Sequence, residues 1–206
     1  MCDRSFIEYI ISTYSEVNGE QETKNNLVEP FLKELGYDID CIDDIKTEVT
    51  CDAGKNNEKV DYVLCIAGTP KIIVEAKDRK EKLGPKYINQ LFRYFSTSDC
   101  KVAVLTNGIE YLFFSDFQKE NIMDKEPFYK INVLYMKDED RRFLNNFCKV
   151  QQCSYPVEKF IIEEKTKRLL KNKVQLSQII SICCFRDLSA RDAVLNAIMK
   201  TIEGGI

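Results

Sequence analysis

The sequence contains no histidine among its 206 residues. This absence excludes Ser-His-Asp and Cys-His catalysis, zinc sites with histidine ligands, and the classes of nuclease that depend on histidine. No GxxxxGK[ST] segment occurs either, so the chain does not encode a P-loop nucleotide hydrolase. Any acid–base chemistry must therefore come from carboxylates, lysine, tyrosine, cysteine or a metal-activated water.

Long apolar runs and export signals are also missing. No stretch approaches 18 apolar residues, so we expect no membrane-spanning segment. The N-terminus lacks a basic region and a small-residue cleavage site, so we expect no signal peptide and a cytoplasmic location. The nine cysteines are irregularly spaced without a CxxC pair, which favours reduced thiols. A zinc site is a weaker alternative, because the spacing of its candidate ligands fits no usual pattern; these are Cys148, Cys153, Cys183 and Cys184.

The chain has no overall positive charge, since its formal net charge is −3. The distribution is uneven: residues 1–50 contain 12 Asp or Glu and 4 Lys or Arg, whereas residues 71–101 contain 8 Lys or Arg and 4 Asp or Glu. Phosphate binding requires a local cationic surface and not a basic chain. An ordinary solvated face explains the same distribution, so charge alone does not decide between these interpretations.

Apolar spacing and turn residues predict an α/β sandwich with a mixed central sheet. Helices are expected over residues 4–17 and 20–35, where Pro30 predicts a kink or a late start and Gly36 a C-terminal cap. The Asn107-Gly108 dipeptide predicts a hairpin turn. The expected strands cover 45–50, 59–66, 71–77, 101–106, 109–115 and 128–134, and a helix ending near Phe95 separates the third from the fourth. Further helices are expected over 138–150, 157–171, 175–184 and 189–203.

This order of elements predicts two parts. Residues 1–136 would form a domain around the sheet, with 128–134 as its edge strand. Residues 137–206 would form a helical subdomain, and the expected use of its apolar faces is the formation of a homodimer.

Two neighbouring predicted strands carry charged residues among their valines and isoleucines, on either side of a turn that contains Gly68. Because side chains alternate along a strand, Glu75 and Lys77 share one face. If the turn is centred on Gly68, Asp61 lies directly opposite Glu75, with their Cβ atoms roughly 4.5–5.5 Å apart. A slip of one residue would break the alternating pattern of both strands.

Two carboxylates at this separation repel each other by about 4 kcal/mol at an effective dielectric constant near 20. A shared proton, a bound cation or the neighbouring Lys77 would offset this repulsion. Oxygen ligands favour a hard dication, Mg²⁺ or Mn²⁺, to which the backbone carbonyl of Ala76 would add a ligand. Such an ion would lower the pKa of a bound water and polarise a phosphoryl oxygen, while Lys77 oriented the water or stabilised negative charge. The pattern therefore predicts a metal-dependent phosphodiester site with Asp61 and Glu75 as ligands.

A simpler interpretation exists for each of these residues. Glu75 and Lys77 would form an ordinary ion pair on an exposed strand face. The following helix carries Gln90 and Tyr94 one turn apart, so both side chains project from one face and would reach phosphate oxygens or Lys77. Taken singly, a surface glutamine and a core tyrosine are commoner.

Five segments follow one another between about residues 20 and 135: EPFLKELGYD, EKVDYVL, IIVEAK, QLFRYF and AVLTNGIEYLFFSD. As a set they resemble the PD-(D/E)xK nucleases, and more narrowly the N-terminal nuclease domain of type I restriction enzyme R (motor) subunits. The resemblance implies a restriction-endonuclease-like fold with an αβββαβ core. It also implies that Asp61 and Glu75 are metal ligands, that Lys77 is catalytic, and that Gln90 and Tyr94 form the accessory motif.

The resemblance extends to the first long helix and then ends. Glu22 matches the acidic position that helps complete the metal site, and Glu29 on the same helix face is the alternative. Ala76 stands where cysteine or valine is common, but its side chain points away from the metal. The helicase motor of the R subunits is missing from this chain, and the helical C-terminal third has no counterpart.

The leading hypothesis is a stand-alone, Mg²⁺-dependent deoxyribonuclease, acting as an endonuclease in a restriction, defence or phage setting with DNA as its partner. The alternative is a catalytically silent module of the same fold that binds nucleic acid or protein, for example an assembly factor. The acidic first 50 residues support this alternative, because that face would repel DNA. A third hypothesis is a decoy that inhibits a restriction system by mimicking its nuclease domain.

Overall fold

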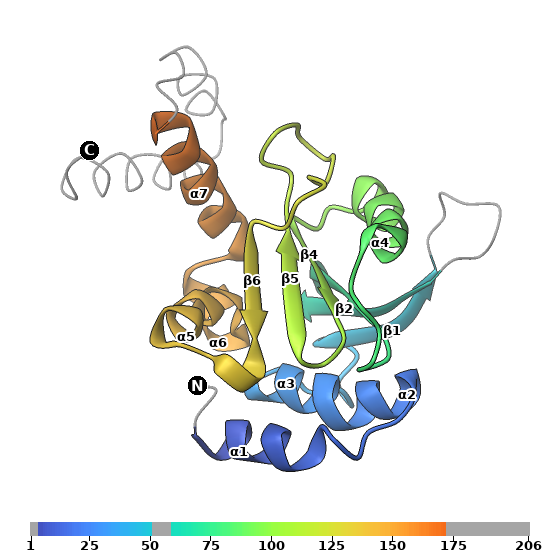
Figure 1. Cartoon of the computed structure of the whole chain (residues 1–206). Coiled ribbons are helices and arrows are strands. Elements are labelled where there is room, and N and C mark those ends of the chain that lie inside the picture. The colour runs from blue at the N-terminus through green and yellow to red at the C-terminus, as the bar shows by residue number, and fades with distance from the viewer. Residues whose placement is uncertain (1–3, 51–58, 172–206) are drawn as a thin grey trace. The chain divides into compact units, whose positions relative to one another are not determined.

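The computed structural model describes residues 4–50 and 59–171 of the chain (Figure 1). The chain divides into two compact units, residues 1–153 and 154–206. Of the second unit, the structure describes mainly helix α7 (Val157–Lys171). The helices expected over 175–184 and 189–203 lie outside the described residues, as do Cys183 and Cys184. The division at residue 136 and the homodimer therefore stay predictions.

A six-stranded sheet forms the centre of the first unit, with its strands in the order β1 to β6 (Figure 1). Neighbouring strands are antiparallel except β3 and β4, which are parallel and joined through helix α4 (Pro85–Thr97). The strands are β1 (Ile45–Thr50), β2 (Lys59–Ile66), β3 (Thr69–Ala76), β4 (Val102–Thr106), β5 (Glu110–Phe114) and β6 (Tyr129–Asn132). The sequence prediction of a mixed α/β sheet with a helix–β1–β2–β3–α4–β4 core is confirmed, and β6 is an edge strand as expected.

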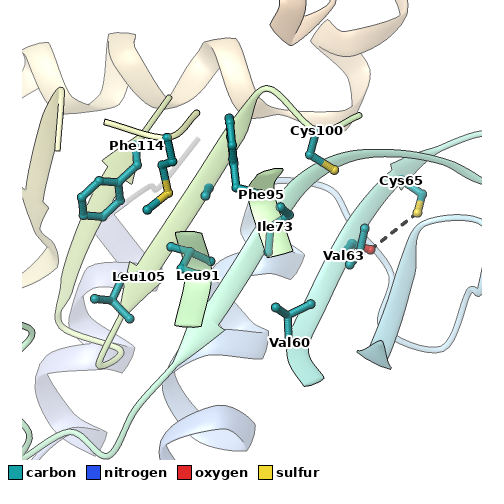
Figure 2. Packing of buried hydrophobic residues seen from close by; sticks show 11 residues of the cluster. Val60, Val63, Cys65, Ile73, Leu91, Phe95, Cys100, Leu105 and Phe114 are labelled. Atoms are coloured by element: carbon teal, nitrogen blue, oxygen red, sulfur yellow. Dashed lines mark hydrogen bonds between the residues drawn. The ribbon is translucent and has the colours of Figure 1, made fainter. Parts of the chain in front are cut away.

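Helix α4 covers one face of the sheet. Leu91 and Phe95 of this helix pack on strand residues such as Ile73 and Leu105, and Figure 2 shows this cluster. The buried thiol of Cys65 lies at its border and donates a hydrogen bond to the carbonyl oxygen of Val63 at 3.6 Å. Burial of these side chains fixes which residues of β3 face α4, because side chains alternate along the strand.

The opposite face of the sheet packs against the N-terminal helices. Phe31 of helix α3 (Glu29–Glu34) stacks on Tyr111 of β5 with ring centroids 4.1 Å apart. Phe147, in the short 3₁₀ helix η3 (Asn145–Phe147), packs on Phe113 of the same strand. Most residues of β2, β3 and β4 are buried, and Asp61 and Glu75 are among them.

The long helix expected over residues 20–35 is divided into three pieces. A four-residue helix α2 (Glu20–Thr23) leads into a π-helix η1 (Lys24–Val28), and α3 follows with Pro30 in its first turn. A π-helical turn therefore precedes Pro30, the residue from which the sequence predicts a kink or a late start. Gly36 follows α3 at φ +89°, as predicted for a C-terminal cap.

Other helices differ from their expected lengths. Helix α1 ends at Thr13, four residues earlier than expected. The helix expected over 138–150 consists of α5 (Asp138–Leu144), η3 and the start of α6 (Lys149–Ser154). The last part of the strand expected over 128–134 forms the 3₁₀ helix η2 (Val133–Tyr135). Among the described helices, none has both the length and the apolar character needed to cross a membrane.

The β2–β3 hairpin reaches its register by an irregular route. Its tight turn consists of Ala67 and Gly68, both at positive φ, and pairs Ile66 with Thr69. That turn alone would place Asp61 opposite Val74. A bulge between Leu64 and Cys65 shifts the pairing by one residue, so that Tyr62 faces Val74. Continued by one position, this register places Asp61 opposite Glu75, as the sequence predicts.

The β4–β5 turn predicts a measurable stability difference. Gly108 has φ +81°, and a Cβ atom there would lie 2.7 Å from Cβ of Leu27 in η1. Gly108→Ala should therefore lower the free energy of unfolding. The loss should be about 1–3 kcal/mol larger than for Gly→Ala at a positive-φ position where the new Cβ atom has no close neighbour. Gly36→Ala is the matched control, because Gly36 has φ +89° and its nearest neighbour would lie at 3.6 Å. Equal losses for both variants in urea unfolding would contradict this close packing.

Candidate functional site

Asp61 and Glu75 lie side by side on β2 and β3 with almost no exposure to solvent. Asp61 is 8% exposed and Glu75 is 1% exposed. The Oδ2 atom of Asp61 accepts a hydrogen bond from the backbone N–H of Ala76 at 2.7 Å, which fixes the carboxylate against the end of β3. The exposed strand face of the simpler interpretation is therefore not what the structure shows.

Lys77 follows β3 and directs its ammonium group back to this pair. Its Nζ atom lies 2.6 Å from Oε1 of Glu75 and 3.9 Å from Oε2 of Glu20. The ring of Tyr87, at the start of α4, covers the same ammonium at 5.3 Å from the ring centroid. Burial by itself would lower the pKa of Lys77, but the adjacent Glu75 carboxylate outweighs it and the pKa is raised. Lys77 is thus held as a cation.

A second ammonium group belongs to the site, and the sequence analysis missed it. Lys24 opens the π-helix η1, and its Nζ atom lies 2.5 Å from Oδ1 of Asp61. Here too burial opposes the charged form, but the hydrogen bond and charge of Asp61 prevail and the pKa of Lys24 is raised. A lysine on a mostly polar helix resembles a surface residue in sequence, and its partner is far along the chain. The one local signal is Glu20, which lies one turn earlier and 3.4 Å from Lys24.

The charge balance around Glu75 is incomplete. Burial, and then repulsion by Asp61, raise the pKa of Glu75 to about 7 in spite of the contact with Lys77. Its Oε2 atom is buried and has no hydrogen-bond partner in the described part of the chain. A buried carboxylate oxygen without a partner is unfavourable, and a bound cation or a hydrogen-bond donor would satisfy it.

Both candidates for the third acidic ligand are engaged elsewhere. Oε2 of Glu22 accepts a hydrogen bond from the backbone N–H of Asn18 at 2.8 Å, and Oε1 of Glu29 accepts one from the hydroxyl of Tyr62 at 3.0 Å. The helical carboxylate that lies near Lys77 is that of Glu20. Positions 20 and 22 differ by two residues, which places their side chains on nearly opposite faces of a helix. The role of Glu22 and Glu29 as ligands stays a prediction.

The predicted accessory pair, Gln90 and Tyr94, lies on α4, and the structure shows one contact of Gln90 with the strands. Its Nε2 atom donates a hydrogen bond to the carbonyl oxygen of Lys59 at 3.0 Å. Tyr94 is half-buried and packs against the cluster on the α4 face of the sheet. The ring of Tyr87, which the sequence analysis does not single out, lies over the ammonium group of Lys77. In sequence, Tyr87 follows Gly84-Pro85, a dipeptide typical of a helix start. This helix start is the local signal that places Tyr87 shortly after the end of β3.

The segment after Lys77 ties the N-terminal helices to the site. The backbone N–H of Arg79 donates to the hydroxyl of Thr23 at 2.9 Å, and its Nε atom donates to the carbonyl oxygen of Val17 at 3.0 Å. Nζ of Lys80 donates to Oδ1 of Asn18 at 2.7 Å. These contacts hold α2 and the residues before it beside the end of β3, which brings the two lysines and two strand carboxylates together.

The residues present fit a divalent cation. Within the described residues, no three Asp, Glu, His or Cys side chains converge as a metal cage. Mg²⁺, however, is commonly held by one or two carboxylates, with water and substrate phosphate as its other ligands. Asp61 and Glu75 provide two adjacent carboxylates, and Oε2 of Glu75 is a buried acceptor without a partner. The Ala76 carbonyl would be a further oxygen ligand.

Comparison with known protein families gives a match to part of the chain. Residues 43–122 match the family model of the type I restriction enzyme R protein N terminus. The resemblance predicted from the sequence is confirmed. The matched segment contains Asp61, Glu75 and Lys77, whereas Lys24 and the N-terminal helices lie before it.

Among solved structures, a chain of a DrdV–DNA complex determined by cryo-EM is similar, with 14% identity and a TM-score of 0.45. The similarity covers 82% of this chain and 16% of that chain, so this protein spans a small part of the length of its structural neighbour. A search of the curated proteins finds no match.

The raised pKa of Glu75 predicts how stability depends on pH. Its folded pKa of about 7 lies above its ordinary value of 4.5. The stabilising contribution of the protonated group is therefore complete below about pH 4.5 and is lost as the pH rises through about 7. Glu75→Gln should flatten this dependence in urea unfolding of the metal-free protein between about pH 5 and pH 8.

The control for this experiment is Glu110→Gln, which changes an exposed carboxylate on β5. That variant should keep the pH dependence of the unsubstituted protein. If Glu75→Gln and the unsubstituted protein lose stability in parallel as the pH rises, the assigned environment of Glu75 is wrong.

Proposed function

We propose that this protein is a metal-dependent nuclease that hydrolyses phosphodiester bonds in DNA, as an endonuclease within a restriction or defence system. The observation that carries the proposal is the buried pair of Asp61 and Glu75, which lies beside the cationic Lys77 and has an unsatisfied oxygen. The match of residues 43–122 to a restriction enzyme family supports the same conclusion.

Asp61 and Glu75 would hold Mg²⁺ or Mn²⁺, with the Ala76 carbonyl as a further ligand. When bound, the ion would polarise a phosphoryl oxygen and acidify the attacking water. The chain's own part is to fix the two carboxylates through the sheet and to exclude bulk water from them. Lys77, held cationic by Glu75 and covered by Tyr87, would stabilise the negative charge that develops on the phosphate.

The surface next to Lys77 suits a polyanionic substrate. Lys80, Lys82 and Lys86 are exposed, and all three follow directly on the site in the loop and first turn of α4. Loop and helix-start lysines of this kind contact phosphates without reading base sequence. Gln90 and Tyr94, which the family resemblance makes the accessory motif, would act on this same side of the sheet.

A catalytically silent binding module is the second candidate function. The ion pair between Lys24 and Asp61 favours it, because a lysine can neutralise this carboxylate in place of a metal. In that case the fold would hold nucleic acid or a partner protein, and the site would contribute only to stability. A cleavage assay separates the two candidates.

The test is incubation of plasmid DNA and linear single-stranded DNA with the protein in Mg²⁺ or Mn²⁺. We expect cleavage that EDTA abolishes and that Lys77→Ala lowers by at least about 100-fold, as when one charge-stabilising group is removed from an active site. Lys130→Ala is the matched control: it removes an exposed lysine from β6 and should leave the rate unchanged.

Two results would contradict nuclease function. One is the absence of cleavage on either DNA form with either metal. The other is cleavage that persists at the same rate in Lys77→Ala, which would identify a contaminating enzyme. Either result would leave the silent module as the better description.

A further inference from the structure

Lys24 lies in contact with three carboxylates and is itself almost completely buried. Its Nζ atom lies 2.5 Å from Asp61, 3.4 Å from Glu20 and 3.7 Å from Glu48, and its side chain is 11% exposed. Lysine is rarely buried unless it is paired, because removing its ammonium group from water is energetically unfavourable. The shortest contact is with the predicted metal ligand.

Two local irregularities of the backbone converge on this ammonium group. Lys24 is the first residue of the π-helical turn η1, and such turns occur frequently at functional sites. Glu48 stands within β1 at φ +51°, an uncommon conformation for a residue with a side chain. Because Thr47 pairs with Tyr62 and Val49 with Val60, Glu48 occupies the position across from Asp61.

The contacts of Asp61 make Oδ1 the oxygen over which a lysine and a metal would compete. Oδ2 accepts the N–H of Ala76, which is part of the strand framework. Oδ1 is the oxygen that Lys24 contacts. A dication and an ammonium group at the same carboxylate oxygen repel each other, so binding of an ion to Oδ1 favours the withdrawal of Lys24.

The other two carboxylates provide a place for the withdrawn ammonium group. The side chains of Glu20 and Glu48 are 44% and 56% exposed, and both already lie within 4 Å of Nζ. With Asp61, Glu75 and Lys77 included, four carboxylates and two ammonium groups are in contact in this network. When all are ionised the network carries two excess negative charges, which one divalent ion would balance.

We propose that Lys24 is a displaceable counter-ion, which neutralises Asp61 in the metal-free protein and competes with the divalent ion for that carboxylate. On metal binding, the ammonium group of Lys24 leaves Asp61 and pairs with Glu20 and Glu48. This inference rests on the proposed function, because it takes Asp61 as a metal ligand. It adds a positioning residue that sets the metal affinity and keeps the site intact before the metal arrives.

The experiment compares Lys24→Met with the unsubstituted protein in Mn²⁺ titration calorimetry and in thermal unfolding with EDTA or saturating Mn²⁺. Methionine keeps most of the buried stem but removes the charge. Without metal, Lys24→Met should unfold at a lower temperature, because Asp61 loses its partner. Its affinity for Mn²⁺ should nevertheless be higher, on the order of tenfold, and its stabilisation by Mn²⁺ correspondingly larger.

A purely structural lysine would not produce these opposite signs, because its loss would lower the unfolding temperature in both conditions and weaken or leave unchanged the metal affinity. Lys24→Arg should bind Mn²⁺ no more tightly than the unsubstituted protein, because arginine keeps a positive charge next to Asp61. Lys101→Met is the matched control: Lys101 pairs with the buried Asp116 at 3.4 Å beside the opposite end of β4. It should leave the Mn²⁺ affinity unchanged.

The outcomes separate this inference from the proposed function. If Asp61→Asn weakens Mn²⁺ binding while Lys24→Met does not strengthen it, Lys24 is not a competitor and the inference fails alone. If no Mn²⁺ binding depends on Asp61 in any variant, the proposed metal site fails and the inference with it. Should Lys24→Met not fold without metal, Lys24→Gln replaces it, and the same two outcomes apply to that variant.

Discussion

Repulsion between two carboxylates on neighbouring strands is the constraint around which this protein is built. Asp61 and Glu75 are both nearly excluded from water, and the sheet itself contributes one backbone hydrogen bond, from the N–H of Ala76 to Asp61. Lys77 and Lys24 each contact one of them, yet burial and Asp61 still raise the pKa of Glu75 to about 7. Two ammonium groups face four carboxylates in this network, and this imbalance of charge is the physical reason to propose a divalent ion.

Several parts of the fold serve to bring the charges together. The bulge at Leu64 shifts β2 by one residue so that the carboxylates face each other. The π-helical turn presents Lys24 to Asp61 from the N-terminal helices. The hydrogen bonds of Arg79 to Thr23 and Val17 hold those helices against the end of β3. A site assembled from three distant segments in this way loses its geometry if any one of them moves.

The sheet and its register were predictable from sequence because they depend on local periodicity. Alternating apolar residues identify β2 and β3, and the even spacing from Asp61 to Glu75 places both on one face. The assumed turn at Gly68 gave the correct pairing only because the tight turn and the bulge compensate each other. Lys24 was not predictable, because its pairing with Asp61 joins segments that no local pattern connects. The proximity of Glu20 to Lys77 was not predictable for a related reason: a helix face cannot be assigned until the helix itself is oriented.

The most direct test of the metal site is a crystal structure of the protein soaked in Mn²⁺, with anomalous diffraction to locate the metal. If Asp61 and Glu75 together form the site, one anomalous peak will lie within about 2.5 Å of an oxygen of each carboxylate. A structure in which no peak touches both carboxylates, while Lys24 still occupies Asp61, would contradict it.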